Sequence, residues 1–168
     1  MGMIANYARL TPTQLDRALR DPEWAHTHVL ELERAAWQAG QPAPSQARFL
    51  DIDKTWGALA VLLSGKNVPV EVIFGDAGIP GAPSWGTSPP HALAPERVAL
   101  AAELLGRISG AELTEGADTE KLEREDVCPA IWDEGEDALE YVRKHYEPLV
   151  EFVTAAAGEG EALLVWLN

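Results

Sequence analysis

Ala162-Leu163-Leu164-Val165-Trp166-Leu167 is an unbroken apolar run that follows the turn-forming Gly158-Glu159-Gly160. Its length and composition predict a short buried strand. Residues 2–10 at the other end of the chain carry few charges and predict a similar strand, with apolar side chains at Met3, Ile4, Tyr7 and Leu10. Chain ends are ordered only when something holds them, so we expect these two strands to lie side by side in one sheet.

Most of the chain between these strands predicts helices. Thr11-Pro12 followed by Gln14, and then Asp21-Pro22-Glu23, are typical of a capping residue with proline in the first turn. Apolar residues recur at helical spacing in several segments. The sequence therefore predicts two helices between Pro12 and about Ala39, one from Trp56 to about Gly65, and others over Pro95–Ile108, 118–125 and about 135–157, the last kinked or divided by Pro148.

Two segments in the middle of the chain do not predict helices. Residues 68–74 alternate as a short edge strand would, and residues 75–94 form a long loop rich in glycine and proline. Few strands among many helices indicate an α+β fold. We expect a small, mostly antiparallel sheet that includes the N-terminal and C-terminal strands and is packed with several helices.

The size and charge of the chain restrict the kinds of partner that it can bind. The 168 residues suit a single domain over 1–168. A net charge of −14, from 27 acidic and 13 basic side chains, argues against a nucleic-acid partner, which requires clustered lysine and arginine. The same charge favours encounter with a basic protein, although acidity also serves solubility alone.

The chain lacks the marks of a secreted or membrane protein. Cys128 is its single cysteine, so no intrachain disulfide can form. The N-terminus has neither the basic nor the long apolar part of a signal peptide, and no run approaches the ~20 apolar residues of a membrane span. We therefore expect a cytoplasmic protein with no membrane partner.

Leu50-Asp51-Ile52-Asp53-Lys54-Thr55-Trp56 is the best local candidate for a site. Asp53 would cap the helix that follows it, Asp51 would form an ion pair with Lys54 or with Arg48, and Trp56 would anchor the helix. A binding surface and a pair of catalytic carboxylates are the alternatives. The cap and ion pair are favoured, because such networks also perturb carboxylates that have no catalytic role.

The same segment contributes to a family resemblance that extends over essentially the whole chain. Met1-Gly2-Met3-Ile4, residues 50–56, Ala94-Pro95-Glu96-Arg97-Val98 and Cys128-Pro129-Ala130-Ile131-Trp132, in this order and spacing, resemble the YfbM-like family of uncharacterised bacterial proteins. The resemblance implies a cytoplasmic α+β domain of unknown function. It implies no catalytic residues, because that family has none to carry over.

The long loop supplies two further candidates, Trp85 and His91. His91 follows two prolines and has hydroxyl side chains nearby, as an acid–base group would, although most loop histidines are simply solvated. The chain has no HExxH motif and no cluster of cysteine and histidine, and its glycine-rich fragments complete no phosphate-binding motif. We therefore expect no metal and no cofactor.

Residues 112–140 hold the strongest charge feature. Twelve acidic side chains there face only Lys121 and Arg124, so this region carries −10 of the total −14. A solvated face is the ordinary interpretation of such a run. The more specific hypothesis is a docking surface for a basic protein, with Trp132 as its aromatic anchor beside Asp133.

The sequence does not decide whether the protein is an enzyme and leaves its oligomeric state open. It favours a non-enzymatic binding or protein-interaction module that uses an acidic surface, such as an immunity-type inhibitor, by analogy with small acidic inhibitors. The alternative is a small hydrolase-like enzyme or a ligand sensor, with its site between Asp51 or Asp53 and the loop that carries His91.

Overall fold

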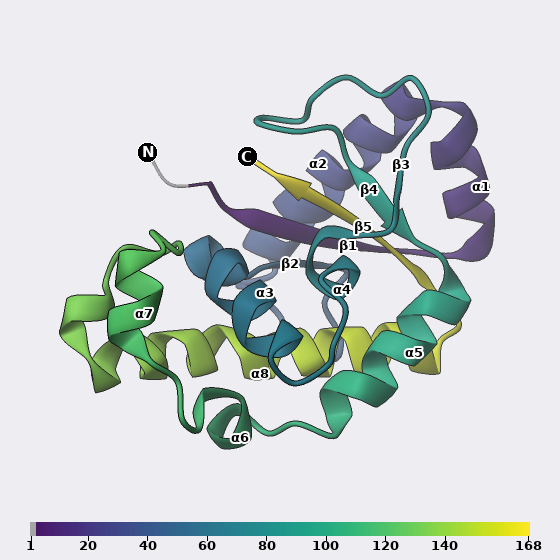
Figure 1. The fold of residues 1–168 in the computed structure, drawn as a ribbon. Coiled ribbons are helices and arrows are strands. Elements are labelled where there is room, and N and C mark those ends of the chain that lie inside the picture. Colours follow the sequence, from purple (N-terminus) through teal and green to yellow (C-terminus); the bar gives the residue numbers. More distant parts are fainter. Residues whose placement is uncertain (1–2) are drawn as a thin grey trace.

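A computed structural model describes residues 3–168 and contains one five-stranded antiparallel sheet with helices on both faces (Figure 1). The strands are β1 (Ala5–Leu10), β2 (Phe49–Asp51), β3 (Ala77–Gly78), β4 (His91–Leu93) and β5 (Ala162–Leu167). Their order across the sheet is β2-β1-β5-β4-β3. The predicted α+β class and mostly antiparallel sheet are confirmed.

The two ends of the chain form the centre of this sheet. β1 pairs with β5 over its full length, from Ala5 opposite Leu167 to Leu10 opposite Ala162. β5 also pairs with β4 on its other side, so its backbone is hydrogen-bonded to two neighbours. The predicted pairing of the terminal strands is therefore confirmed, and Figure 1 shows the two strands running together through the molecule.

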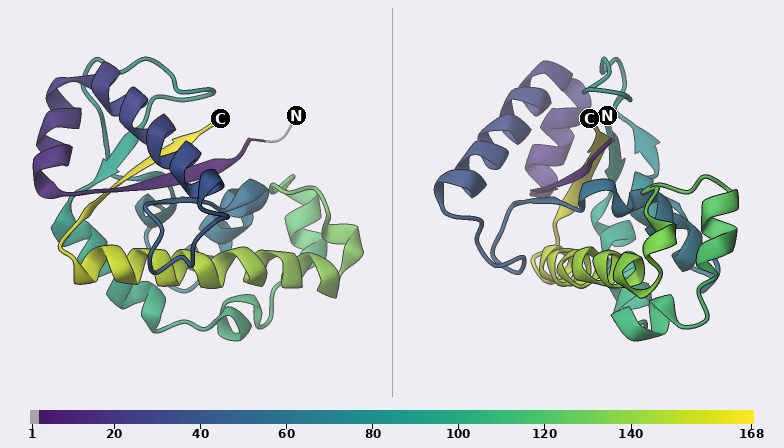
Figure 2. Two further views of the ribbon diagram at one scale, coloured as in Figure 1. Left: turned by 180° about the vertical axis from the view of Figure 1, so that it is seen from behind. Right: turned by 90° about the vertical axis from the view of Figure 1, so that its left-hand side faces the viewer.

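Both faces of each central strand are buried because helices cover them. Alternate side chains of a strand point to opposite sides, so Tyr7 and Val165 enter one core while Ala8 and Leu164 enter the other. The helices α1 (Pro12–Arg20) and α2 (Pro22–Gln38) cover the second of these cores. The first lies under α3 (Trp56–Ser64), α5 (Pro95–Gly106) and α8 (Glu136–Gly158), as both views of Figure 2 make visible.

The helices begin where their capping residues predict. The Thr11 side chain accepts from the backbone N–H of Gln14, and the Gln14 side chain returns a bond to the Thr11 N–H. Asp21 accepts from the N–H of Trp24 at the start of α2. These bonds satisfy backbone donors that have no partner within the helix. α7 (Thr119–Arg124) also forms where expected, and α8 runs through Pro148 without dividing.

Two sequence-based predictions about the middle of the chain are wrong. Residues 68–74 do not form a strand, because Pro69 and Val70 accept the bonds of a helical turn that becomes α4 (Glu71–Phe74). Residues 75–94 are not a simple loop, because they contain β3 and β4. These strands have two and three residues, so they are too short for a period-two pattern to appear in the sequence. β2 and α6 (Gly110–Thr114) were not predicted at all.

Candidate functional site

The segment around Asp51 leaves the sheet through a tight turn. β2 ends at Asp51, and a single 3-10 turn (Asp53–Thr55) leads into α3. Asp51 Oδ1 accepts a hydrogen bond from the backbone N–H of Asp53 at 3.1 Å, which holds the Asp51 carboxylate in place. Asp53 itself has a φ of 50°, a left-handed conformation that aspartate tolerates better than most residues.

The predicted cap at Asp53 is wrong. No side chain caps the start of α3, and Asp53 Oδ2 instead accepts a hydrogen bond from the Tyr141 hydroxyl at 2.5 Å. Burial raises the pKa of Tyr141, and the hydrogen bond to Asp53 raises it further. Lys54 is exposed and forms no ion pair with any residue in 3–168, and Arg48 pairs with Glu161, so neither ion pair predicted for Asp51 is present in that range.

Trp56 anchors the start of α3, as the sequence predicts. Its indole N–H donates to the backbone carbonyl of Met3 at 2.8 Å, and its ring contacts Phe74 edge-on. These contacts tie α3 to the chain before β1 and to α4. We conclude that Trp56 has a structural role, because its one polar atom is already used inside the protein.

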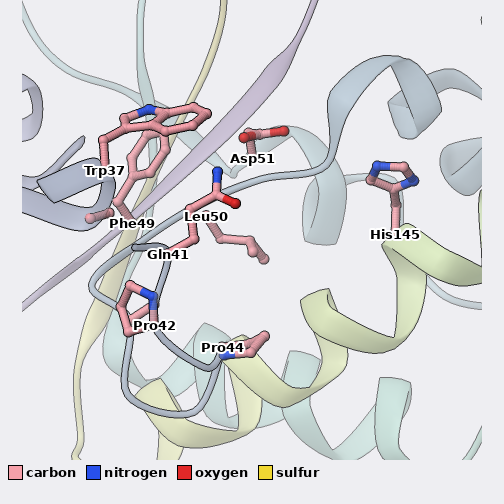
Figure 3. A pocket seen from close by; sticks show the side chains of 10 residues that line it. Trp37, Gln41, Pro42, Pro44, Phe49, Leu50, Asp51 and His145 are labelled. Atoms are coloured by element: carbon pink, nitrogen blue, oxygen red, sulfur yellow. The ribbon is translucent and has the colours of Figure 1, made fainter. Parts of the chain in front are cut away.

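A pocket of about 310 Å³ lies at the edge of the sheet beside β2 (Figure 3). We call it the edge pocket. It is bounded by the end of α2, the proline-rich connector 39–48, the edge strand β2 and one side chain of α8. Its lining residues are Ala36, Trp37, Gln41, Pro42, Pro44, Ala47, Phe49, Leu50, Asp51 and His145. This volume suits a small ligand or a single side chain.

Three features make the edge pocket unusual for a surface hollow. Trp37 is 60% exposed, although tryptophan is ordinarily well buried. Gln41 has a backbone φ of 56°, which few residues other than glycine adopt, and its amide lies below Trp37 and Asp51 in the view of Figure 3. The carboxylate of Asp51 lies on the same side of β2 as the indole, with His145 at the far end.

An ionic cluster, in which Arg9 and Glu161 are buried and Arg48 is partly exposed, holds the connector that forms one wall. Arg9 Nη1 donates to the backbone carbonyls of Ser45 and Ala47, and Arg9 Nη2 binds Glu161 Oε1 at 2.6 Å. Arg48 binds the other oxygen of Glu161 at 2.8 Å. A single carboxylate thus positions two guanidinium groups, which fix the connector against β1. The wall of the edge pocket is therefore preformed rather than loose.

Sequence reasoning identified Asp51 but missed the rest of this pocket. Trp37 was not among the candidates, although its indole lies at the surface. The available signal was the position of Trp37 just before the break Gly40-Gln41-Pro42, where a helix face no longer has a neighbour to cover it. His145 follows Asp51 by more than ninety positions in the chain, and no local sequence feature links the two residues.

The loop candidates lie elsewhere. Trp85 is only 3% exposed and packs against Trp166 and His26, so the prediction of a binding role for its side chain is not supported. His91 lies on β4, where Nδ1 is 3.1 Å from the carbonyl of Pro89. Two strands separate β4 from β2, which corresponds to about 14 Å at the usual strand spacing. The structure does not bring His91 together with Asp51.

The acidic residues of 112–140 gather at one end of the molecule, on α6, α7 and the start of α8 (Figure 1). We call this surface the acidic end. All of its carboxylates are exposed, and within the described chain only Glu125 and Glu136 have an ion-pair partner. Asp133 is exposed, but Trp132 is 3% exposed and donates to the carbonyl of Val127. The predicted aromatic anchor at Trp132 is therefore wrong.

Cys128 lies between the acidic end and α3. Its carbonyl accepts the N–H of Ala58 at 2.9 Å, and burial raises the pKa of its thiol. A raised pKa disfavours the nucleophilic thiolate. Within residues 3–168, no group of three or more histidine, cysteine or acidic side chains is arranged to hold a metal ion. None of the helices described there has the length and hydrophobicity needed to cross a membrane.

Comparison with other proteins gives a family and a fold. The family model described as a domain of unknown function, DUF1877, matches residues 1–166. The crystal structure of a protein of unknown function, YfbM from Escherichia coli, has a TM-score of 0.70 and 16% sequence identity, covering 98% of this chain and 99% of that chain. At this identity the likeness supports the fold alone. The curated proteins contain no match to the chain.

Proposed function

This chain belongs to the DUF1877 family, whose function is unknown, and from its own geometry we propose that it is a non-enzymatic binding module for a basic protein. The acidic end is the docking surface in this proposal. The observation that carries it is the exposure of every carboxylate in residues 112–140, in a region with a charge of −10.

The distribution of charge supports a partner rather than solubility alone. Solubility requires a net charge but not its concentration at one end of the molecule. Most carboxylates there have no cation beside them within the described chain, so their field extends into solvent. Such a field raises the association rate with a basic partner and lowers it with an acidic one.

The acidic end also continues towards the edge pocket. Asp137 and His145 lie on the same helix, α8, about 12 Å apart along its axis at ~1.5 Å per residue. A basic partner held by the acidic end would therefore lie near a preformed hollow. Because Asp51 and His91 are not neighbours, no corresponding observation favours the hydrolase-like alternative.

Affinity capture tests the proposal with a charge-neutralised bait. The variant replaces four exposed carboxylates of the acidic end with their amides, Glu120→Gln, Glu123→Gln, Asp133→Asn and Glu134→Gln. We expect the wild-type chain to capture a basic protein from a lysate of its source organism at about 50 mM salt and to release it at about 500 mM salt. The variant should lose that protein.

A matched control removes the same charge elsewhere. It carries Asp16→Asn, Glu31→Gln, Glu151→Gln and Glu159→Gln, which are exposed positions on other helices and turns. This control should retain the captured protein at about the wild-type level. Equal loss in both variants would indicate a general effect of net charge, and retention by both would refute the acidic end as the docking surface.

A further inference from the structure

We propose that the edge pocket binds an organic cation, an alkylammonium group carried on a short apolar stem. This inference rests on the edge pocket alone and does not depend on the acidic end. The contributing residues are the exposed indole of Trp37, the fixed carboxylate of Asp51, the Gln41 amide and the proline walls of the connector.

The indole provides a face for a cation. Trp37 is the most exposed of the large hydrophobic side chains described, at 60%, and it lines the edge pocket near the end of α2. A positive charge over an indole face is attracted by the negative face of the ring, and tryptophan is the best of the aromatic side chains for this contact. An exposed tryptophan at the rim of a pocket is also a common binding anchor.

The carboxylate supplies the charge. Asp51 is the only acidic or basic side chain, histidine apart, among the residues that line the edge pocket. Its Oδ1 is fixed by the N–H of Asp53, while Oδ2 accepts no hydrogen bond from any residue in 3–168. The guanidinium groups of Arg9 and Arg48 are already bound to Glu161. A ligand with a positively charged hydrogen-bond donor would bind the Oδ2 atom of Asp51.

The remaining walls select an apolar stem. Pro42, Pro44 and Leu50 line the lower part of the edge pocket in Figure 3, where they offer no donor from their side chains. His145 closes the far end, and its Nδ1 lies 2.9 Å from the carbonyl of Tyr141. A carbonyl can only accept, so Nδ1 of His145 donates the hydrogen in this contact.

A titration followed by NMR tests this assignment. The probes are butylammonium, 1-butanol and butanoate, which share a four-carbon stem and differ in charge, at constant ionic strength and pH 7.5. We expect butylammonium alone to give saturable shifts at the indole N–H of Trp37 and the backbone N–H of Asp53. Equal shifts with 1-butanol would overturn the proposal, because the pocket would then recognise only the stem. Absence of saturable shifts with butylammonium would overturn it as well.

Two variants locate the recognition groups. Asp51→Asn keeps an oxygen that can accept from Asp53 but removes the charge, and it should weaken butylammonium binding at least ~10-fold. Trp37→Ala should weaken it about 2- to 5-fold, as followed at Asp53. The matched controls, Asp16→Asn and Leu30→Ala, change an exposed carboxylate and another exposed apolar side chain of α2 and should leave the affinity unchanged. Unchanged affinity in Asp51→Asn would refute the proposal.

A last comparison identifies the source of the cation. Nα-acetyl-lysine N-methylamide presents the same ammonium on a peptide side chain. If it binds as tightly as butylammonium or more tightly, the edge pocket is assigned to a lysine of a partner protein. If it binds at least ~10-fold more weakly, the pocket is assigned to a free amine. Both outcomes support the binding of an organic cation in the edge pocket. The measurements that can contradict this binding are the titrations with the three four-carbon probes and with the variants.

Discussion

Arg9 Nη2 and Glu161 Oε1 lie 2.6 Å apart inside the protein, with side chains that are 6% and 4% exposed. Arg9 lies on β1 and Glu161 directly precedes β5, so the ion pair joins two neighbouring strands at the centre of the sheet. Arg9 also binds two carbonyls of the connector. The ion pair thereby joins the sheet to the wall of the edge pocket.

Glu161→Gln should destabilise the protein by about 3 to 5 kcal/mol, because it leaves the buried Arg9 without its counter-charge and Arg48 without its partner. Urea unfolding followed by circular dichroism measures the change. The control is Glu103→Gln, which removes an exposed ion pair with Arg107 and should change stability by less than about 0.5 kcal/mol. A Glu161→Gln variant within about 1 kcal/mol of wild type would contradict the structural role of the pair.

Tyr141→Phe should cost about 1.5 kcal/mol, because the hydroxyl no longer donates to Asp53 Oδ2. Asp53→Asn keeps the left-handed turn, which asparagine tolerates. A double-mutant cycle of these two substitutions should give a coupling energy of about 1 kcal/mol. Strictly additive effects would show that the hydrogen bond contributes nothing to folding.

The protein should unfold as its tyrosines ionise. Burial raises the pKa of Tyr7, Tyr141 and Tyr146, which are all of its tyrosines, and that of Tyr146 reaches about 12. Between about pH 10 and 12 the folded state keeps protons that the unfolded state releases, so stability falls as pH rises through this window. Absorbance at 295 nm and far-UV circular dichroism should change together there. Ordinary tyrosine titration near pH 10 with an intact fold would contradict this.

Gly57→Ala should destabilise the protein by about 1 to 3 kcal/mol, because the new Cβ would lie 2.8 Å from the carbonyl oxygen of Cys128. That oxygen cannot move freely, since it accepts the N–H of Ala58. Gly106→Ala at the end of α5 is the matched control, with open space around its Cβ. It should be neutral or stabilising by up to about 1 kcal/mol, so its thermal midpoint should equal or exceed that of the wild type while the midpoint of Gly57→Ala falls.

Removal of residues 162–168 should unfold the chain, because β5 is hydrogen-bonded to β1 on one side and β4 on the other. Far-UV circular dichroism and the thermal transition measure the loss. Removal of Asn168 alone is the control and should leave a cooperative transition, since β5 ends at Leu167. A truncated chain with the wild-type spectrum and midpoint would refute the central place of β5.

Helices were predictable where the signal was local. Thr11, Asp21 and Pro95 mark helix starts through bonds or backbone angles set within one turn, and these elements formed as expected. The short strands β2, β3 and β4 could not be predicted in this way. Each has two or three residues and exists only because a neighbouring strand lies beside it.

The candidate site shows the same division. Asp51 stood out in the sequence as one of two carboxylates beside a helix start. The ion pair and the His91 neighbour that were expected for it are absent from residues 3–168. Asp53 binds Tyr141, which lies 88 positions away, and Trp85 and Trp132 are buried. Whether a tryptophan is exposed depends on what packs against it, and this cannot be read from its neighbours along the chain.

The sequence by itself determined the α+β class, the pairing of the two chain ends, most helices and the YfbM-like family, whose resemblance the family match confirms. These features depend on apolar periodicity, capping and composition, which are all local or global properties of the chain. Only the tertiary structure decided that Trp37, Asp51 and His145 share one pocket and that Asp51 and His91 do not. The physical reason is that a pocket forms where distant elements leave a gap, and the gap depends on how those elements pack.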